Sequence, residues 1–224
     1  MRILTVILLS LFTITASSAQ MMGSEESDPQ ATKILDKLKS EYDGYSSMEI
    51  DFNLIMEIPG QEEENQKGNV IRQADKYKLS VGDRVIFSNG DYIWLYIGKN
   101  NEVQINDADL GDDSEDMISP TNMLQMYESG DFVYAITDEP FVDGRKLTKI
   151  DFKPLDKDTE YSKIALFVDT RENDIKQIKI FSKDGSRYTL QVNGVKSNEK
   201  YASDVFEFNS SDYPGVHIED LRID

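Results

Sequence analysis

Apolar residues first recur at helical spacing along this chain. Asp28-Pro29 has the form of a helix start, with aspartate at the N-cap and proline in the first turn. Apolar side chains then follow every three or four positions until Gly44, where the helix is expected to end. These apolar residues are Ala31, Ile34, Leu35, Leu38 and Tyr42. The pattern predicts one amphipathic helix lying on a larger body.

From Met48 onward the apolar period changes to two, which is typical of strands with one buried face. The first such strand alternates Met48, Ile50, Phe52, Leu54, Met56 and Ile58 with mostly polar residues. Turn sequences such as Asn89-Gly90 and Asp184-Gly185 separate the strands that follow. The predicted strands cover residues 48–58, 69–73, 76–81, 84–88, 92–97, 102–106, 132–137, 146–152, 162–169, 175–182 and 188–193. About eleven antiparallel strands in a chain of this length must curl or close, because a flat sheet would leave long exposed edges.

A short helix is predicted within this series of strands. Ser119-Pro120 resembles an N-cap and first turn, and Gly130 ends the segment. Its apolar face consists of Met123, Leu124, Met126 and Tyr127. Two interpretations are open, an ordinary packing helix or a lid over the mouth of the curled sheet.

The first residues have the form of an export signal. Met1-Arg2 is followed by an apolar run from Ile3 to Ile14 and by the small residues 16–19. We expect a signal peptide over residues 1–19, and cleavage after Ala19 would leave 224 − 19 = 205 residues in a single domain, 20–224. The alternative is an uncleaved anchor, although the run is shorter than the ~20 residues of a membrane-spanning helix. The chain has no cysteine, which excludes disulfides and an acylated N-terminal cysteine.

Charge and residue types narrow the possible functions. The formal net charge is 24 − 42 = −18, which repels nucleic acid and disfavours stable docking on an anionic membrane surface. His217 is the only histidine, so zinc sites and Cys-His pairs are not expected. The acidic run from Asp107 to Asp116 does not match an EF-hand loop, because its glycine, Gly111, falls one position early. We therefore expect no enzyme activity, no cofactor and no metal, while a scattered carboxylate site stays open as an alternative.

Two predicted strands, 92–97 and 164–168, are apolar on both faces. A sheet that curls around a cavity needs such strands, with one face against the packed helix and the other lining the interior. A well-filled barrel core gives the same pattern, and periodicity does not distinguish the two. The residues expected to line an apolar cavity are Ile50, Phe52, Leu54, Met56, Tyr77, Trp94, Leu166 and Ile178.

Several segments, taken in order, resemble a known family. The stretch 85–96, Val-Ile-Phe-Ser-Asn-Gly-Asp-Tyr-Ile-Trp-Leu-Tyr, is similar to the hairpin of the LolA-type outer-membrane lipoprotein carriers. Ile118-Ser119-Pro120 and the helix after it resemble the lid region of that family. Phe206-Glu207-Phe208, Pro214-Gly215-Val216 and Asp220-Leu221-Arg222 resemble its C-terminal signature. The resemblance covers essentially the whole mature chain.

The resemblance implies an incomplete antiparallel β-barrel with a helical lid over an apolar cavity that holds the acyl chains of lipoproteins. It implies a periplasmic protein that receives acylated lipoproteins from an inner-membrane ABC-type releasing complex and delivers them to an outer-membrane acceptor. Such a carrier is expected to act as a monomer and without covalent chemistry. A carrier or sensor of another lipid or glycolipid on the same scaffold is the alternative, because a fold does not fix its ligand.

One position departs from the family pattern. The family has a cavity-side arginine followed by proline before an aromatic strand residue, and this arginine helps to hold the lid closed. Counting back from Tyr77 places Gln73 and Ala74 at those two positions, and Arg72 lies one residue earlier. Unless a bulge intervenes, Arg72 is then expected on the face opposite the cavity. Arg72 as a lid latch is a hypothesis on this basis.

Overall fold

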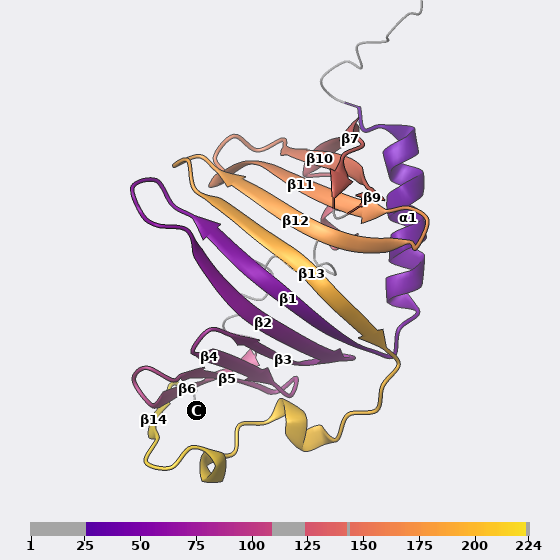
Figure 1. Cartoon of the computed structure of the whole chain (residues 1–224). Helices are drawn as coiled ribbons and strands as arrows, with labels where there is room; N and C mark the ends of the chain where they lie inside the picture. The colour runs from indigo at the N-terminus through magenta and orange to yellow at the C-terminus, as the bar shows by residue number, and fades with distance from the viewer. Residues whose placement is uncertain (1–25, 109–123, 143, 223–224) are drawn as a thin grey trace, which may run out of the picture.

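The computed structural model describes residues 26–108, 124–142 and 144–222, and the sheet that they form dominates the molecule (Figure 1). The chain is mainly β, as the sequence predicts, with a helix α1 (Pro29–Asp43), a helical turn at residues 124–126 and two 3₁₀ turns, η2 (Ser203–Phe206) and η3 (Ser210–Asp212). The strands are β1 (Ser47–Glu57), β2 (Glu64–Gln73), β3 (Lys76–Val81), β4 (Arg84–Ser88), β5 (Tyr92–Ile97), β6 (Glu102–Asp107), β7 (Phe132–Asp138), β8 (Phe141–Val142), β9 (Arg145–Lys146), β10 (Thr148–Pro154), β11 (Tyr161–Asp169), β12 (Asp174–Ser182), β13 (Arg187–Ser197) and β14 (His217–Asp220). None of the helices in the described ranges is long and apolar enough to cross a membrane.

Twelve of the strands in the described ranges form one curled, unclosed sheet in the order β14-β6-β5-β4-β3-β2-β1-β13-β12-β11-β10-β7. Two antiparallel meanders make up this order, β1 to β6 and β7 to β13, with the small β8–β9 hairpin inserted in the second. The meanders join where β1 pairs with β13, from Met48 opposite Ser197 to Glu57 opposite Arg187. The expected curled antiparallel sheet is confirmed, while β14, which pairs parallel with β6, was not predicted.

Helix α1 begins where the sequence predicts. The Asp28 side chain accepts a hydrogen bond from the Gln30 N–H at 2.8 Å, and Pro29 follows it in the first turn. Asp28 also donates its own N–H to the Tyr134 carbonyl of β7 at 2.8 Å, and its carboxylate accepts from the Ile136 N–H at 3.3 Å. The segment before α1 therefore covers the outer edge of β7, which would otherwise present unpaired backbone groups.

We call the side of the sheet on which α1 packs the inner face. Directly opposed residues of neighbouring strands share a face, so the ladders assign every strand position to one side. Inner-face residues of β1, β7 and β10 to β13 form the main hydrophobic core with α1 and residues 124–127. Fully buried members of this core are Leu35, Leu38, Ile150, Phe152, Ile164, Leu166, Val168, Ile175 and Ile178. One half of the inner face is thus filled by the helix.

The outer face of β3 to β6 has a separate cover, the segment after β13. Figure 1 shows this segment running beneath the strands. The Phe208 ring lies 6.1 Å from Phe87 and 6.2 Å from Tyr96, and the Tyr213 ring lies 4.3 Å from Tyr96. Phe206 in η2 is fully buried. The apolar surplus on both faces of β5 is explained by this aromatic cover, whereas the sequence pattern had suggested a helix in that place.

Candidate functional site

The half of the inner face that α1 does not cover carries apolar side chains that are only half-buried. They come from consecutive strands, β1 to β5, and alternate with outward-facing positions. These residues are Leu54, Met56, Val70, Tyr77, Ile86, Ile93 and Leu95. We call this group the apolar strip. Chemically it can bury hydrocarbon, since each CH₂ removed from water contributes about 0.8 kcal/mol.

The structure does not bring together the eight residues predicted to line a cavity. Ile50, Leu166 and Ile178 lie in the packed core beneath α1, with at most 2% of each side chain exposed. Leu54, Met56 and Tyr77 belong to the apolar strip. Phe52 and Trp94 belong to neither group.

Phe52 is buried on the inner face because its cross-strand neighbour is Gly68. A Cβ atom on Gly68 would lie 2.2 Å from the Cζ atom of Phe52, so only glycine leaves room for the ring. The aromatic ring therefore fills the space that a side chain on β2 would occupy. This pairing marks the boundary between the packed half of the inner face and the apolar strip.

Trp94 lies on the outer face of the sheet. It is opposed to Phe87 on β4 and to Ile105 on β6, whereas Tyr77 is opposed to Ser88. Because side chains alternate along a strand, Trp94 and Tyr77 point to opposite sides. The tryptophan packs edge-on against Tyr92, with ring centroids 6.0 Å apart. The structure does not bring it together with the apolar strip.

The predicted lid helix is described only from Leu124 onward, so Met123 lies outside the described residues. Leu124 and Tyr127 are buried in the main core. The Tyr127 hydroxyl donates to Asp36 Oδ1 on α1 at 3.1 Å, and burial together with this carboxylate raises the pKa of Tyr127. The end of the predicted lid segment is therefore attached to α1.

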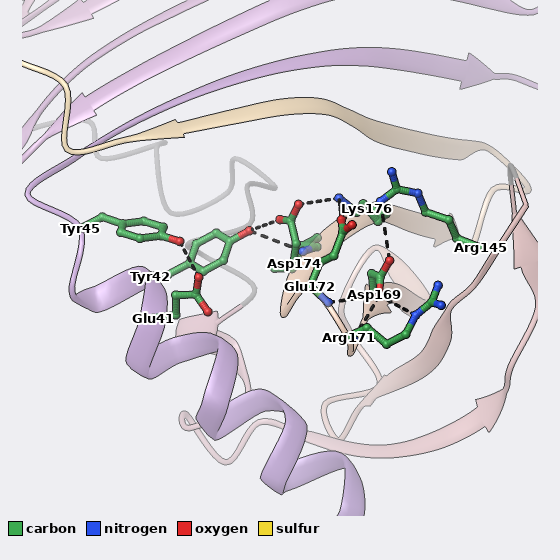
Figure 2. A network of polar contacts seen from close by, with 10 residues as sticks. Glu41, Tyr42, Tyr45, Arg145, Asp169, Arg171, Glu172, Asp174 and Lys176 are labelled. Atoms are coloured by element: carbon green, nitrogen blue, oxygen red, sulfur yellow. Dashed lines mark hydrogen bonds and ion pairs between the residues drawn. The ribbon is translucent and has the colours of Figure 1, made fainter.

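A polar network that the sequence did not indicate fixes the other end of α1 to the turn between β11 and β12 (Figure 2). The Tyr42 hydroxyl donates to Asp174 Oδ1 at 2.9 Å, and the Lys176 ammonium lies 2.6 Å from Asp174 Oδ2. Burial and the Asp174 carboxylate raise the pKa of Tyr42. Next to it, hydrogen bonds from Asn173 and Tyr45 hold the pKa of Glu41 below its ordinary value.

Asp169 forms the buried end of this network. Its Oδ1 atom accepts hydrogen bonds from the Arg171 N–H at 3.1 Å and the Glu172 N–H at 3.3 Å. Its Oδ2 atom accepts no hydrogen bond from the described residues but lies 3.7 Å from the Arg145 guanidinium. Burial alone would raise the pKa of Asp169, yet the backbone hydrogen bonds and nearby cations hold it below its ordinary value. The network is structural, since its charged groups pair with one another.

Arg72 lies on the inner face, contrary to the position that the sequence predicts for it. The β1–β2 ladder runs without a bulge from Ser47 opposite Gln73 to the far end of β1, which places Arg72 opposite the inward-facing Met48. Gln73 faces outward, where its side-chain oxygen accepts from the Tyr201 N–H at 3.4 Å. Counting back from Tyr77 therefore predicts the wrong face for Arg72. The part of the predicted lid before Leu124, which Arg72 would hold in the latch hypothesis, lies outside the described residues.

The described residues give little support for a catalytic site or a metal site. His217 is exposed on β14. Within the described ranges, no three acidic or histidine side chains gather so as to hold a metal ion. The acidic run after Asp107 lies outside those ranges. The strongest candidate for function is therefore the apolar strip.

Comparisons with known proteins agree with this geometry. The sequence model of the family described as outer membrane lipoprotein carrier protein LolA matches residues 60–209. No curated protein matches the sequence. Among solved structures, an uncharacterized conserved protein from Thermus thermophilus has a TM-score of 0.55 at 11% identity, with 87% of this chain and 99% of that chain covered.

Two further solved structures are less similar to this chain. A LolA superfamily protein from Nitrosomonas europaea has a TM-score of 0.40 at 11% identity, with 80% of this chain and 97% of that chain covered. The lipoprotein LppX from Mycobacterium tuberculosis has a TM-score of 0.47 at 14% identity, with 80% and 100% covered. At such low identities, structural similarity is relevant to the fold alone, and of these three the Thermus protein alone, with its TM-score of 0.55, supports the fold.

Proposed function

Because the chain belongs to the family of LolA outer-membrane lipoprotein carriers, we propose that it binds the acyl chains of lipoproteins and carries them across the periplasm. In this proposal an export signal over residues 1–19 is removed. An inner-membrane ABC-type complex supplies the lipoprotein, and an outer-membrane acceptor takes it. The protein acts as a monomer and performs no covalent chemistry.

The observation that carries this proposal is the apolar strip. A sheet that served only as a scaffold would bury both faces of β1 to β5 or expose polar side chains there. Here the outer face of β3 to β5 is sealed by aromatic rings, while the inner face keeps half-buried apolar residues on consecutive strands. Partly exposed apolar side chains that gather on consecutive strands are typical of a binding surface.

The burial of an acyl chain provides enough free energy for the protein to carry it. An acyl chain with about 14 CH₂ groups gains roughly 11 kcal/mol when it leaves water completely. A strip that covers the acyl chain on one side would provide only a part of this free energy. Partial recovery suits a carrier, because a ligand that is bound too strongly could not be released.

The test is mass spectrometry of the material that co-purifies with the protein from its own host. The protein carries a C-terminal tag and is recovered from the periplasm. Acylated lipoproteins in the bound fraction would support the proposal. Free phospholipid or glycolipid alone would support the alternative, a carrier or sensor of another lipid, and an empty protein would refute both.

A pair of variants on β1 makes this test specific to the inner face. Leu54 and Ile55 are adjacent, half-buried and aliphatic, but they point to opposite sides of the sheet. Leu54→Gln is expected to lower the amount of bound lipoprotein several-fold, whereas Ile55→Gln should leave it within about twofold. Equal losses in the two variants would mean that destabilisation, not the apolar strip, determines the yield.

A further inference from the structure

A second feature of the inner face is a cavity of about 370 Å³ at the end of α1. It lies where α1 leads into β1 and where β2 ends. Its walls are formed by Tyr42, Asp43, Tyr45, Ser46, Ser47, Met48, Arg72 and Ala74. We call it the Arg72 pocket. A cavity of this volume accommodates a small polar group together with part of an attached chain.

Arg72 supplies the positive charge of this pocket. Its Nε atom donates to the Ala74 carbonyl at 3.1 Å, which fixes the direction of the guanidinium. None of the carboxylates in the described residues lies within ion-pair distance of Arg72. By contrast, Arg145, Arg171, Arg187 and Arg222 each have such a carboxylate partner. The terminal N–H groups of Arg72 are therefore available to a ligand.

The other polar groups in the wall are already engaged. The Ser46 hydroxyl donates to Asn198 at 3.1 Å, and the Ser47 hydroxyl donates to the Glu199 carbonyl. The tyrosine hydroxyls donate to Asp174 and Glu41. The one carboxylate in the wall, Asp43, is paired with Lys39. Arg72 is thus the group that would select the ligand.

The pocket adjoins the apolar part of the inner face. Arg72 is opposed to Met48 on one side and to Tyr77 on the other, so all three side chains share that face. Two residues further along β2, Val70 is opposed to Ile50 and to Leu79. Ile50 and Leu79 are buried, so a molecule with its polar end at Arg72 would have its hydrocarbon over the half-buried Tyr77 and Val70 of the apolar strip.

We propose that the Arg72 pocket binds the anionic head group, a phosphate or a carboxylate, of an amphiphile whose hydrocarbon lies on the apolar strip. This inference rests on the proposed binding of hydrocarbon by the strip, and it concerns an anionic lipid as a further ligand, because the acylated cysteine of a lipoprotein carries neither anion. Guanidinium groups bind both anions through paired N–H donors. The net charge of −18 opposes any anion at long range, so a preference for anionic ligands requires a local site such as this one.

The experiment compares three single-chain amphiphiles of equal length by isothermal titration calorimetry below their micelle concentrations. Dodecyl maltoside is uncharged, and dodecyl phosphate and dodecanoate carry the two candidate anions. For the unchanged protein we expect at least one anion to bind roughly tenfold to a hundredfold more tightly than the maltoside. The anion that shows the preference identifies the head-group chemistry.

Two arginine variants make the measurement specific. Arg72→Gln should abolish the preference for the anion and leave maltoside affinity unchanged. Arg84→Gln should change neither, because Arg84 is exposed on the same face and lacks an ion-pair partner among the described residues, but lies outside the pocket. A preference that survives in Arg72→Gln, or equal losses for all ligands in that variant, would overturn the inference while the strip still binds chains. Failure of the unchanged protein to bind any of the three would instead refute the proposed function.

Discussion

Replacing Tyr42 by phenylalanine tests whether the network in Figure 2 holds α1 on the sheet. The change removes one hydroxyl from a side chain that is only 7% exposed. That hydroxyl donates to the Asp174 carboxylate at 2.9 Å and accepts from the Ile175 N–H at 3.5 Å. A buried hydrogen bond to a charged group contributes about 1.5–3 kcal/mol. We expect the free energy of unfolding to fall by that amount.

Urea denaturation followed by fluorescence measures this loss. Trp94 is the only tryptophan and lies on the outer face of β5, so it reports global unfolding without contacting the mutated site. With a urea dependence of about 2 kcal/mol per molar, the midpoint should fall by roughly 1 M. The control is Tyr45→Phe, whose hydroxyl meets the exposed Glu41 at 2.9 Å and should contribute under about 0.5 kcal/mol.

A double-mutant cycle with Asp174→Ala isolates the pair. The coupling energy between Tyr42 and Asp174 should be at least about 1 kcal/mol, because the groups are in direct contact. If Tyr42→Phe costs no more than Tyr45→Phe, or if the coupling is near zero, the attachment of α1 depends on apolar packing alone. The polar network would then contribute nothing to the attachment of α1.

Three further predictions concern packing, pH and the C-terminal cover. Gly68→Ala should lower the unfolding free energy by about 1–3 kcal/mol because its Cβ would meet the Phe52 ring at 2.2 Å; Gly194→Ala, with open space around it, should cost under about 1 kcal/mol in the same denaturation assay. The lowered pKa of Asp169 means that its contribution is complete above its ordinary pKa and is lost as pH falls toward the folded value. The difference in unfolding free energy between the unchanged protein and Asp169→Asn should therefore be larger at about pH 7 than at about pH 3, and an unchanged difference would contradict this. Phe206→Ala removes a fully buried ring and should cost about 3–5 kcal/mol by urea denaturation; a loss below about 1 kcal/mol would mean that the segment after β13 is not part of the cooperative fold.

Alternating polarity predicts the individual strands well. The predicted segments 76–81, 84–88 and 92–97 coincide with β3, β4 and β5. These strands are short and end at tight turns, where Gly82 and Gly90 adopt positive φ angles of 58° and 96°. Local sequence is sufficient in such cases because the turn and the alternation agree.

The faces of the sheet were harder to predict than its strands. On β5, both sets of alternate positions are apolar, so the sequence does not indicate which set faces inward. The answer depends on Phe208 and Tyr213, which cover the outer face from a segment more than 100 residues later. Trp94 was assigned to the cavity for this reason, and the ladders place it outside.

Two other features, strand β14 and the contact between Tyr42 and Asp174, have no recognisable pattern in the sequence. Strand β14 is four residues long, exposed throughout and parallel to its neighbour, so it shows no alternation. The contact between Tyr42 and Asp174 joins residues 132 positions apart. An aspartate in a turn is common and carries no indication of a partner on a distant helix.

The β1–β13 ladder also has a consequence for the order in which the chain can fold. It pairs residues near position 50 with residues near position 195, whereas most other ladders join strands that are close neighbours in sequence. Hairpins of the two meanders can form early, but the inner face is assembled only when this distant pairing closes, and non-local pairings of this kind form slowly. Until then both halves expose their apolar residues to water, including those that α1 finally covers. The interval between synthesis and closure is therefore when the chain is most prone to aggregate, and a holding chaperone would be most effective during that interval.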